Sequence, residues 1–306
     1  MTTTTTTIET THSTSHDLKA ELAEHGFVVI PSLLSASELS TLRSATATST
    51  AAARAGKWPH IRTLPKQFPP WGSDPSVGIW GVQHLLHPSQ PGNEVYARSY
   101  FHPGVLAAVA EILSCDADDL VMELYNLLVR PDADFALRWH RDDVPATASA
   151  EQELEVLRAP ITHAQWNLAL YDDASLIVVP GSHRRARTDE ERVADPYQEH
   201  ISGMKVVEMK AGDVVFYNNN ILHRGKYLAE RERATLHGSM GITAGEKGRA
   251  RNVLQHGVGG WVDQCDFSKL DGTWQGRPLK QVAEGMRGRL KAMGTGETVE
   301  YFSKDE

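Results

Sequence analysis

Hydrophobic and polar positions divide the chain into two unlike parts. Before residue 120 the pattern combines amphipathic helices with one buried strand. From residue 120 to about 245 it consists of short apolar or alternating runs separated by turn residues, and we expect no helix of comparable strength before about residue 277. An antiparallel sandwich or barrel is therefore favoured over a parallel α/β sheet. The expected strands are LVMELYNLLVRP, FALRWHRD, THAQWNLALY, SLIVVPGSH, MKVVEMKAGDVVFYNN and RATLHGSMGI.

Helices are expected on both sides of this strand-rich region. LKAELAEH predicts a short amphipathic helix before the buried strand GFVVIPSLL, and SASELSTLRSAT predicts a helix start with Ser35 or Ser37 as N-cap and Glu38 in the first turn. Another helix begins near His102-Pro103, and LKQVAEGMRGRLKAMG predicts a helix near the end. Residues 56–100 are rich in Pro, Gly, Trp and His, which predicts a long irregular segment that forms a lid or pocket wall.

Composition and length fit a globular chain. It has 306 residues, of which 41% are hydrophobic and 23% charged, so a sizeable core can be buried. We expect a disordered Thr-rich tail at residues 1–17 and a single domain at 18–306, with its core at about 120–245 and a C-terminal extension at 246–306. No apolar run is long enough to span a membrane, and the N-terminus lacks the pattern of a secretory signal.

Charge and cysteine usage narrow the class of partner. The formal net charge of −8 argues against a protein that coats nucleic acids. Cys115 and Cys265 are far apart and lack C-x-x-C spacing, which disfavours a disulfide framework or zinc-thiolate site and indicates a reducing, cytoplasmic setting. The expected partner is a small-molecule substrate, without nucleic acid or membrane. The oligomeric state is open, a homodimer included.

The tetrapeptide WHRD places a histidine and an aspartate two residues apart. In a strand, residues i and i+2 point to the same face, so His140 and Asp142 would project together. This spacing also occurs by chance in many chains, and a polar patch at a strand edge is the plain alternative. Two fixed donors make half of the two-histidine, one-carboxylate site of non-haem Fe(II) oxygenases, which needs a second histidine.

His223 is the candidate for the second histidine. It follows an apolar strand and a polar bend in AGDVVFYNNNILHRG, where a surface histidine is the plain alternative. Further along, Arg233 and Thr235 open an apolar strand and share a face. A buried arginine needs a planar anionic partner, and a neighbouring hydroxyl adds a hydrogen bond. This pair would hold the distal carboxylate of 2-oxoglutarate, whereas the plain alternative for Arg233 is a solvated charge within AERERA.

Several motifs in a fixed order carry a resemblance to a known family. WHRD (139–142), LIVVPGSHR (176–184), GDVVFYNNNILHRG and the R-x-T strand resemble the phytanoyl-CoA dioxygenase (PhyH-type) family of Fe(II)- and 2-oxoglutarate-dependent oxygenases. The segment LAEHGFVVIPSLLSASELSTLR is similar to that family's N-terminal segment, and the resemblance covers about residues 18–245. It implies a mainly β fold with flanking helices, a double-stranded β-helix (jelly roll, cupin-like), which agrees with the strands expected from the pattern.

The resemblance assigns the principal site residues and cofactors. His140, Asp142 and His223 would be the iron ligands. Arg233 and Thr235 would anchor the cosubstrate. The cofactors would be Fe(II), 2-oxoglutarate and O2, with ascorbate as a supporting reductant. The carboxylate of Asp142 indicates oxygen chemistry, because halogenating relatives replace it with a small residue.

Other polar residues receive weaker assignments. By resemblance Trp166 matches a tryptophan beside the cosubstrate. Asn126 is expected to point into the barrel, and Gln83 to be a polar group of the pocket. His84 and His87 are expected in the pocket wall or in a satisfied loop, His183 in a structural turn and His237 in the packed core. The charge run HRRARTDEER at 183–192 is expected to be a solvated loop and not a phosphate site.

The expected activity is that of a dioxygenase that hydroxylates or otherwise oxidises a small organic substrate. Aromatic residues such as Trp58, Phe68, Trp71 and Trp80 suit a mostly apolar molecule, and a specialised metabolite is our preferred substrate class. One alternative is a non-catalytic jelly-roll binding protein that retains the pocket. Another is a zinc-dependent cupin-like hydrolase, in which Arg233 would have no role.

Overall fold

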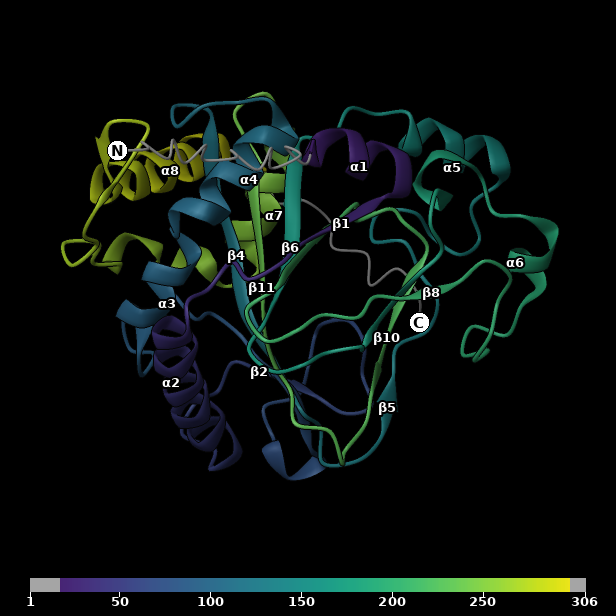
Figure 1. Ribbon diagram of the computed structural model, residues 1–306, viewed down its shortest axis with the longest axis horizontal. Helices are drawn as coiled ribbons and strands as arrows, with labels where there is room; N and C mark the ends of the chain where they lie inside the picture. Colours follow the sequence, from purple (N-terminus) through teal and green to yellow (C-terminus); the bar gives the residue numbers. More distant parts are fainter. Residues whose placement is uncertain (1–16, 298–306) are drawn as a thin grey trace, which may run out of the picture.

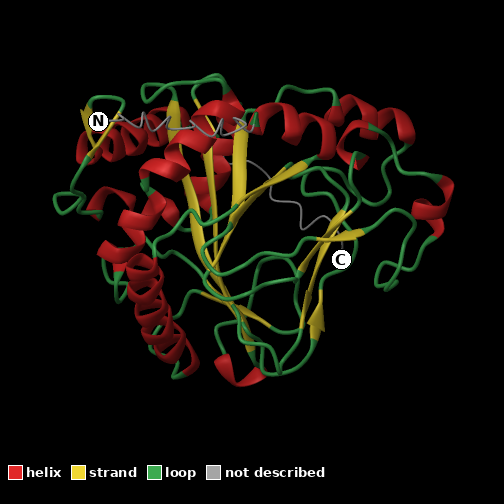
Figure 2. Ribbon diagram, viewed as in Figure 1, coloured by secondary structure: helices red, strands yellow, loops and turns green. Residues whose placement is uncertain are grey.

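Two antiparallel sheets form the centre of the computed structural model, which describes residues 17–297. The tail expected at residues 1–17 therefore lies outside the described residues except for its last one. The larger sheet has seven strands in the order β1-β9-β6-β11-β4-β3-β2, and the smaller has four in the order β5-β10-β7-β8. The strands are drawn in yellow in Figure 2. The large-sheet bounds are β1 Phe27–Ile30, β2 Ile61–Thr63, β3 Ile79–Val82, β4 Leu120–Val129, β6 His163–Ala169, β9 Val214–Tyr217 and β11 Ala234–Ile242. The small-sheet bounds are β5 Phe135–Ala136, β7 Leu176–Val178, β8 Lys205–Val206 and β10 His223–Tyr227.

Helices flank the larger sheet, so the expected mainly β fold with flanking helices is confirmed. α8 packs against β4, α4 against β6 and α2 against β3 (Figure 1). A separate hairpin pairs β12 Thr273–Trp274 with β13 Arg277–Pro278. None of the helices within residues 17–297 combines the length and apolar character needed to cross a bilayer. The helix bounds are α1 Leu18–His25, α2 Ala36–Arg54, α3 Asn93–Tyr100, α4 Pro103–Leu113, α5 Ala150–Leu157, α6 Asp189–Val193, α7 Lys247–Gln255 and α8 Leu279–Met293.

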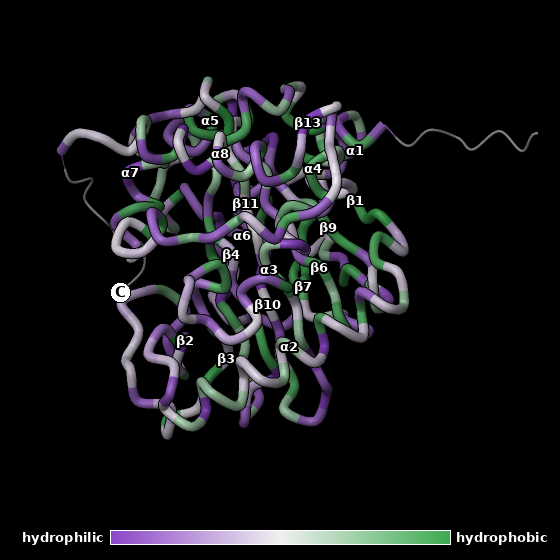
Figure 3. Tube along the Cα trace, turned by 90° about the vertical axis from the view of Figure 1, so that its left-hand side faces the viewer, coloured by the Kyte–Doolittle hydropathy of each residue, from purple (hydrophilic) through white to green (hydrophobic). Residues whose placement is uncertain are grey.

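The main hydrophobic core lies between the large sheet and these helices. Leu106 and Val109 of α4 belong to the same buried cluster as Leu127, Trp166 and Phe216 of the sheet. In Figure 3 the hydrophobic stretches gather on strands such as β6, β7 and β9. Burial of these side chains outside the barrel leaves the opposite face of the same strands free to present polar groups to its interior.

Local signals at the helix starts behave as expected from the sequence. Ser35 caps α2, and its hydroxyl accepts from the backbone N–H of Glu38 while the Glu38 carboxylate accepts from the N–H of Ser35. This reciprocal arrangement satisfies two N–H groups that lack partners within the helix. Pro103 occupies the first turn of α4, where its missing N–H costs nothing.

Three expectations about secondary structure need correction. FALRWHRD is a strand only at Phe135–Ala136, because the N–H groups of Trp139 and Asp142 bond to the loop carbonyls of Pro196 and Asn219, although that of His140 still bonds to β10. Residues 56–100 are not wholly irregular, since β2 and β3 extend the large sheet and α3 follows them. The helices α5, α6 and α7 interrupt or directly follow the strand region before residue 277, and the first two begin with capping boxes.

Candidate active site

Three potential metal ligands converge in a cavity that is lined by residues of both sheets. His223 is the first residue of β10, and His140 bonds to it through both backbone groups, each N–O distance being 3.0 Å. The two imidazole centroids are 4.2 Å apart. Oδ1 of Asp142 lies 3.5 Å from Nε2 of His140 and 3.7 Å from Nε2 of His223. Within the described residues these three form the one group whose geometry suits a metal ion.

Both histidines present the same ring nitrogen to this centre. Nδ1 of His140 lies 2.8 Å from the carbonyl of Arg138, and Nδ1 of His223 lies 2.8 Å from that of Ile221. A carbonyl accepts only, so each Nδ1 carries the proton and each Nε2 keeps its lone pair. Burial and the neighbouring His140 lower the pKa of His223 to about 4, which keeps that ring neutral near pH 7.

Asp142 supplies the anionic ligand. Burial raises the pKa of its carboxyl, but the neighbouring His140 and His223 hold the pKa well below its ordinary value. Its Oδ2 accepts from Nε2 of Gln165 at 3.1 Å, so Oδ1 is the oxygen turned toward the histidines. Two neutral imidazoles and one carboxylate on one side of a centre form the facial donor set of non-haem Fe(II) sites.

Arg233 lies in the same cavity and is held by an aspartate that we did not predict. Its Nε donates to Oδ2 of Asp173 at 3.1 Å, and the guanidinium carbon lies 4.2 Å from the ring centroid of Tyr227. Nη1 is buried and has no hydrogen-bond partner. A buried donor without a partner is costly, so this atom fits an anionic ligand such as a carboxylate.

The expectation for Thr235 needs correction. Its hydroxyl donates to Oδ2 of Asp173 at 2.7 Å and does not line the cavity. A hydroxyl has one proton, so this bond leaves none for a ligand carboxylate. Thr235 therefore fixes Asp173, which in turn fixes Arg233. Only the weak signal of a polar YDD turn after an apolar strand marks Asp173 in the sequence.

The cavity wall combines aromatic and polar groups. Phe68, Trp71 and Trp80 come from the segment that the sequence predicted to be a pocket wall, and Phe68 stands edge-on to the ring of His140 at a centroid distance of 5.5 Å. Polar lining residues come from the strands, from the segment at 83–84 and from the end of α7, so the wall is less apolar than expected. They include Gln83, His84, Asn126, Asn167, His237 and His256.

A family model confirms the family inferred from the motifs. The model for phytanoyl-CoA dioxygenase (PhyH) matches residues 22–227, about two thirds of the chain. The chain belongs to the phytanoyl-CoA dioxygenase family. No curated protein sequence gives a significant match.

Three solved structures illustrate the similarity of this fold to known ones. AviO1 from Streptomyces viridochromogenes Tue57 is 17% identical with a TM-score of 0.52, covering 74% of this chain and 94% of AviO1. EctD from S. alaskensis, solved with 2-oxoglutarate and 5-hydroxyectoine, is 20% identical with a TM-score of 0.54 over 74% and 76%. HygX from Streptomyces hygroscopicus, solved with nickel, 2-oxoglutarate and hygromycin B, is 18% identical with a TM-score of 0.52 over 73% and 85%. These similarities support the jelly-roll fold of this PhyH-family chain.

Trp166 lies elsewhere than the resemblance implied. It is fully buried in the core outside the barrel, where its ring packs near those of Tyr100, Tyr125 and Phe216 at centroid distances of 5.7, 6.3 and 5.7 Å. Successive side chains of β6 alternate between faces, so its neighbours Gln165 and Asn167 point toward the site instead. The prediction of Trp166 beside the cosubstrate is corrected to a core position.

The weaker candidates have mixed outcomes. Asn126 and Gln83 line the cavity, and Oδ1 of Asn126 accepts from the N–H of His84 at 3.1 Å. Their roles in binding stay predictions. His237 lines the cavity instead of packing in the core, and its Nδ1 lies 2.9 Å from Oδ1 of Asn167. His183 is buried in the turn after β7, where its Nε2 lies 3.1 Å from the carbonyl of Ala23.

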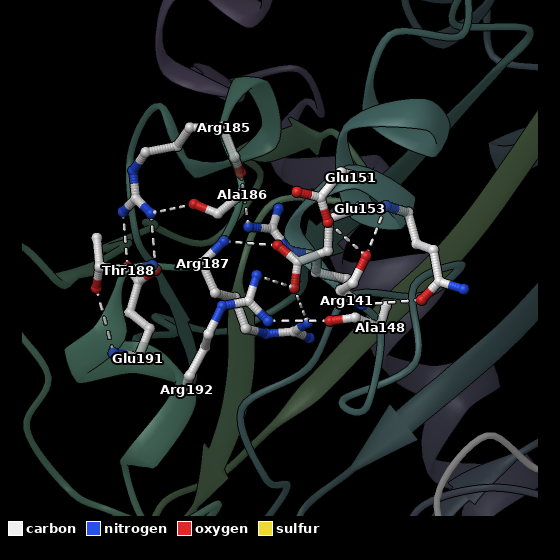
Figure 4. Close-up of polar contacts among 12 residues, drawn as sticks. Arg141, Ala148, Glu151, Glu153, Arg185, Ala186, Arg187, Thr188, Glu191 and Arg192 are labelled. Carbon is white, nitrogen blue, oxygen red and sulfur yellow. Dashed lines mark hydrogen bonds and ion pairs between the residues drawn. The ribbon is translucent and has the colours of Figure 1, made fainter.

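The arginine-rich run at 183–192 is only partly solvated, and its last residues form α6. Arg187 is 9% exposed and donates twice to Glu153 of α5, a residue with no exposed surface, at 2.5 Å from its N–H and 2.5 Å from Nη1 (Figure 4). Arg185 makes a two-pronged pair with Glu191 at 2.7 and 2.6 Å. Because these partners are distant in the sequence or depend on a local turn, a charge count along the chain could not reveal them.

Arg141 joins this network to the metal ligands. It stands between His140 and Asp142 in the sequence, and its side chain is 2% exposed. Nη1 donates to the carbonyls of Ser182 at 2.9 Å and Asn220 at 2.5 Å. It therefore ties the His140–Asp142 segment to the PGSH turn and to the turn that precedes His223.

Proposed function

We propose that this protein is a non-haem Fe(II)- and 2-oxoglutarate-dependent dioxygenase that hydroxylates or otherwise oxidises a small organic molecule. Its substrate would have a mostly apolar body and belong to specialised metabolism. The family and the His140, Asp142 and His223 cluster support the class of enzyme. The small molecules bound to EctD and HygX support a small-molecule substrate.

Each protein group would have a defined task. Nε2 of His140, Nε2 of His223 and Oδ1 of Asp142 would hold the iron, which fits the two nitrogen donors and one anionic oxygen that face the same centre. Arg233 would bind the distal carboxylate of 2-oxoglutarate through its unpartnered Nη1. Bound there, Fe(II) with 2-oxoglutarate and O2 supplies the oxidising equivalent that turns C–H into C–OH, with succinate and CO2 as coproducts.

The lining residues would orient the substrate and exclude water. Phe68, Trp71 and Trp80 offer ring faces to an apolar body, while Asn126 and Asn167 offer amide groups to polar substituents. The single observation that carries the proposal is the convergence of two Nε2 lone pairs and one carboxylate next to a buried arginine with an unpartnered donor.

The first test is spectroscopic. Without O2, addition of Fe(II) and 2-oxoglutarate should produce the weak visible charge-transfer absorption of a chelated keto acid. The His223→Ala variant should lose it, whereas His25→Ala, at an exposed histidine of α1, should keep it. Absence of the band from folded wild-type protein would refute the proposed function.

Two alternatives give different results in the same preparation. A non-catalytic binding protein would bind iron and 2-oxoglutarate but would not release succinate in the presence of O2. A zinc-dependent hydrolase would need zinc, and its activity would not require 2-oxoglutarate. Arg233→Gln, which should weaken cosubstrate binding, would leave that hydrolase activity unchanged.

A further inference from the structure

Three polar residues form one row across the wall of the cavity that contains the metal ligands. His237 of β11 pairs in register with Asn167 of β6 on one side and with Asn126 of β4 on the other. Directly opposed residues of antiparallel strands carry their side chains on the same face, and all three residues line this cavity. The asparagines at positions 167 and 126 are buried, being 4% and 2% exposed. A ligand in the cavity would therefore contact this row.

The amide of Asn126 is fixed in one orientation. Its Oδ1 accepts from the backbone N–H of His84 at 3.1 Å, and a backbone N–H can only donate. His84 itself has a left-handed backbone with φ of 63°, a costly conformation that persists where the surrounding structure enforces it. The NH2 group of Asn126 is therefore a donor, and it has no hydrogen-bond partner among residues 17–297.

The imidazole of His237 is held in one tautomer. Its Nδ1 lies 2.9 Å from Oδ1 of Asn167, and an amide oxygen only accepts, so Nδ1 carries the proton and Nε2 keeps its lone pair. Burial, as the largest cause, lowers the pKa of His237 to about 3, so the ring is neutral near pH 7. Within the described part of the chain, neither Nε2 of His237 nor the NH2 group of Asn167 has a hydrogen-bond partner. The row thus offers one acceptor between two donors.

This order of donors and acceptor selects the chemical group that binds there. The group must donate to Nε2 of His237 and accept from the amides beside it, because a buried polar atom without a partner is costly. An ionised carboxylate only accepts and would face the lone pair of Nε2, whereas an ammonium group only donates. A hydroxyl group has one proton to donate and two lone pairs that accept, so it meets both requirements.

The row is separate from the arginine assigned to the cosubstrate. Arg233 lies four residues before His237, which corresponds to about 13 Å along an extended strand. Its ion pair with Asp173 also lies on the side of the strand away from the row. A ligand at the row can therefore occupy the cavity together with 2-oxoglutarate held by Arg233.

We propose that the substrate is an alcohol whose hydroxyl group donates to Nε2 of His237 and accepts from the amides of the row. This inference rests on the proposed function and deepens it by naming the substrate class. The rings of Phe68, Trp71 and Trp80 line the same cavity and contact the apolar body of the substrate. His237 is then a specificity-determining residue, because the position of the bound hydroxyl fixes which carbon lies next to the metal.

Matched ligand pairs test this inference on the full-length protein loaded with Mn(II) and 2-oxoglutarate, which does not turn over. The probes are alcohols and their methyl ethers on aliphatic, aromatic and polyhydroxylated scaffolds, because an ether oxygen still accepts but has no proton for Nε2 of His237. Calorimetric Kd values should favour at least one alcohol over its ether by about tenfold or more. His237→Phe should abolish that preference, and His237→Gln, whose amide oxygen accepts, should retain part of it. His200→Phe, at an exposed histidine, should leave it unchanged.

The outcomes separate this inference from the proposed function. If no alcohol binds better than its ether in any pair, or if the preference survives in His237→Phe, the inference is overturned. It is also overturned if His237→Phe weakens 2-oxoglutarate binding instead, because His237 would then belong to the cosubstrate site. Failure of wild-type protein to bind Mn(II) and 2-oxoglutarate would instead overturn the proposed function. His237→Gln keeps the test available if His237→Phe does not fold, since it should then show a smaller preference than wild type.

Discussion

Replacement of Arg141 by methionine tests how the metal ligands are positioned. The guanidinium donates to three carbonyls, those of Ser182, Asn220 and Arg185, at 2.9, 2.5 and 3.1 Å. Ser182 lies in the turn after β7 and Asn220 in the turn before His223, and Leu222 of the latter turn donates to the hydroxyl of Ser182 at 2.8 Å. Methionine keeps much of the apolar stem but removes every donor.

The size of the stability effect follows from these hydrogen bonds. A hydrogen bond to a charged group stabilises a fold by about 1.5 kcal/mol, net of desolvation, at the low end of its usual range, so the three together contribute about 5 kcal/mol. Burial, followed by the neighbouring charge of Arg187, lowers the pKa of Arg141 to about 10 from 12.5, so the guanidinium stays charged at pH 7. We therefore expect Arg141→Met to lower the free energy of unfolding by about 5 kcal/mol.

Metal affinity should suffer as well as stability. Without Arg141 the segment of Asp142 and the turn before His223 lose their common anchor, so we expect the Kd for Mn(II) to rise by about ten- to a hundredfold, the usual effect of removing a group that orients ligands. Titration calorimetry of folded protein measures this Kd, and urea unfolding measures stability. Arg184→Met, at an exposed arginine of the turn that contains Ser182, serves as control. If the Kd of Arg141→Met for Mn(II) stays within about twofold of wild type, whether or not the variant is less stable, Arg141 does not position the metal ligands.

Three further predictions concern metal, pH and cosubstrate. Mn(II) at a hundred times its Kd should raise the free energy of unfolding by about 2.7 kcal/mol, and His223→Ala should abolish this gain in thermal unfolding with and without chelator. Burial alone would raise the pKa of Glu123, but Arg249, bonded to it at 2.7 and 2.6 Å, lowers this pKa below 4.5. The pair therefore contributes its full stabilisation above pH 4.5, and this stabilisation is lost as the pH falls through the pKa of Glu123 in the folded protein. Urea unfolding from pH 7 to pH 3 should therefore show a flatter loss for Glu123→Gln than for wild type. Asp173→Asn should weaken 2-oxoglutarate binding about tenfold by loosening Arg233, and unchanged cosubstrate affinity in equilibrium binding would contradict that role.

The sequence predicted features that depend on neighbouring residues, or on motifs that follow one another in a fixed order along the chain. The capping box of Ser35 and Glu38 lies within one turn, so the residue types at these two positions predict it directly. The metal ligands form a short motif followed at a distance by His223, and their order could be compared with a family. The wall formed by residues 56–100 followed from unusual composition, although its two strands did not, because β2 and β3 are too short to show a period.

What the sequence could not predict depends on contacts between distant segments. β6 is buried on both faces for nearly its whole length, so alternation of apolar and polar residues could not show which face carries Trp166. The pair of Arg187 and Glu153 joins residues 34 positions apart, and Asp173 meets Arg233 across 60. Composition assigns such residues to the solvent unless the fold that brings the partners together is known.

The three ligands are not positioned equally firmly. His140 and His223 face each other across a pair of backbone hydrogen bonds, and directly opposed residues of antiparallel segments carry their side chains on the same face. Asp142 has no such strand partner. Its N–H donates to the carbonyl of Asn219 at 2.9 Å, and its carboxylate is oriented by Gln165. The anionic ligand therefore depends on loop segments, and this dependence is the physical reason why the buried arginine beside it should affect metal binding as well as folding.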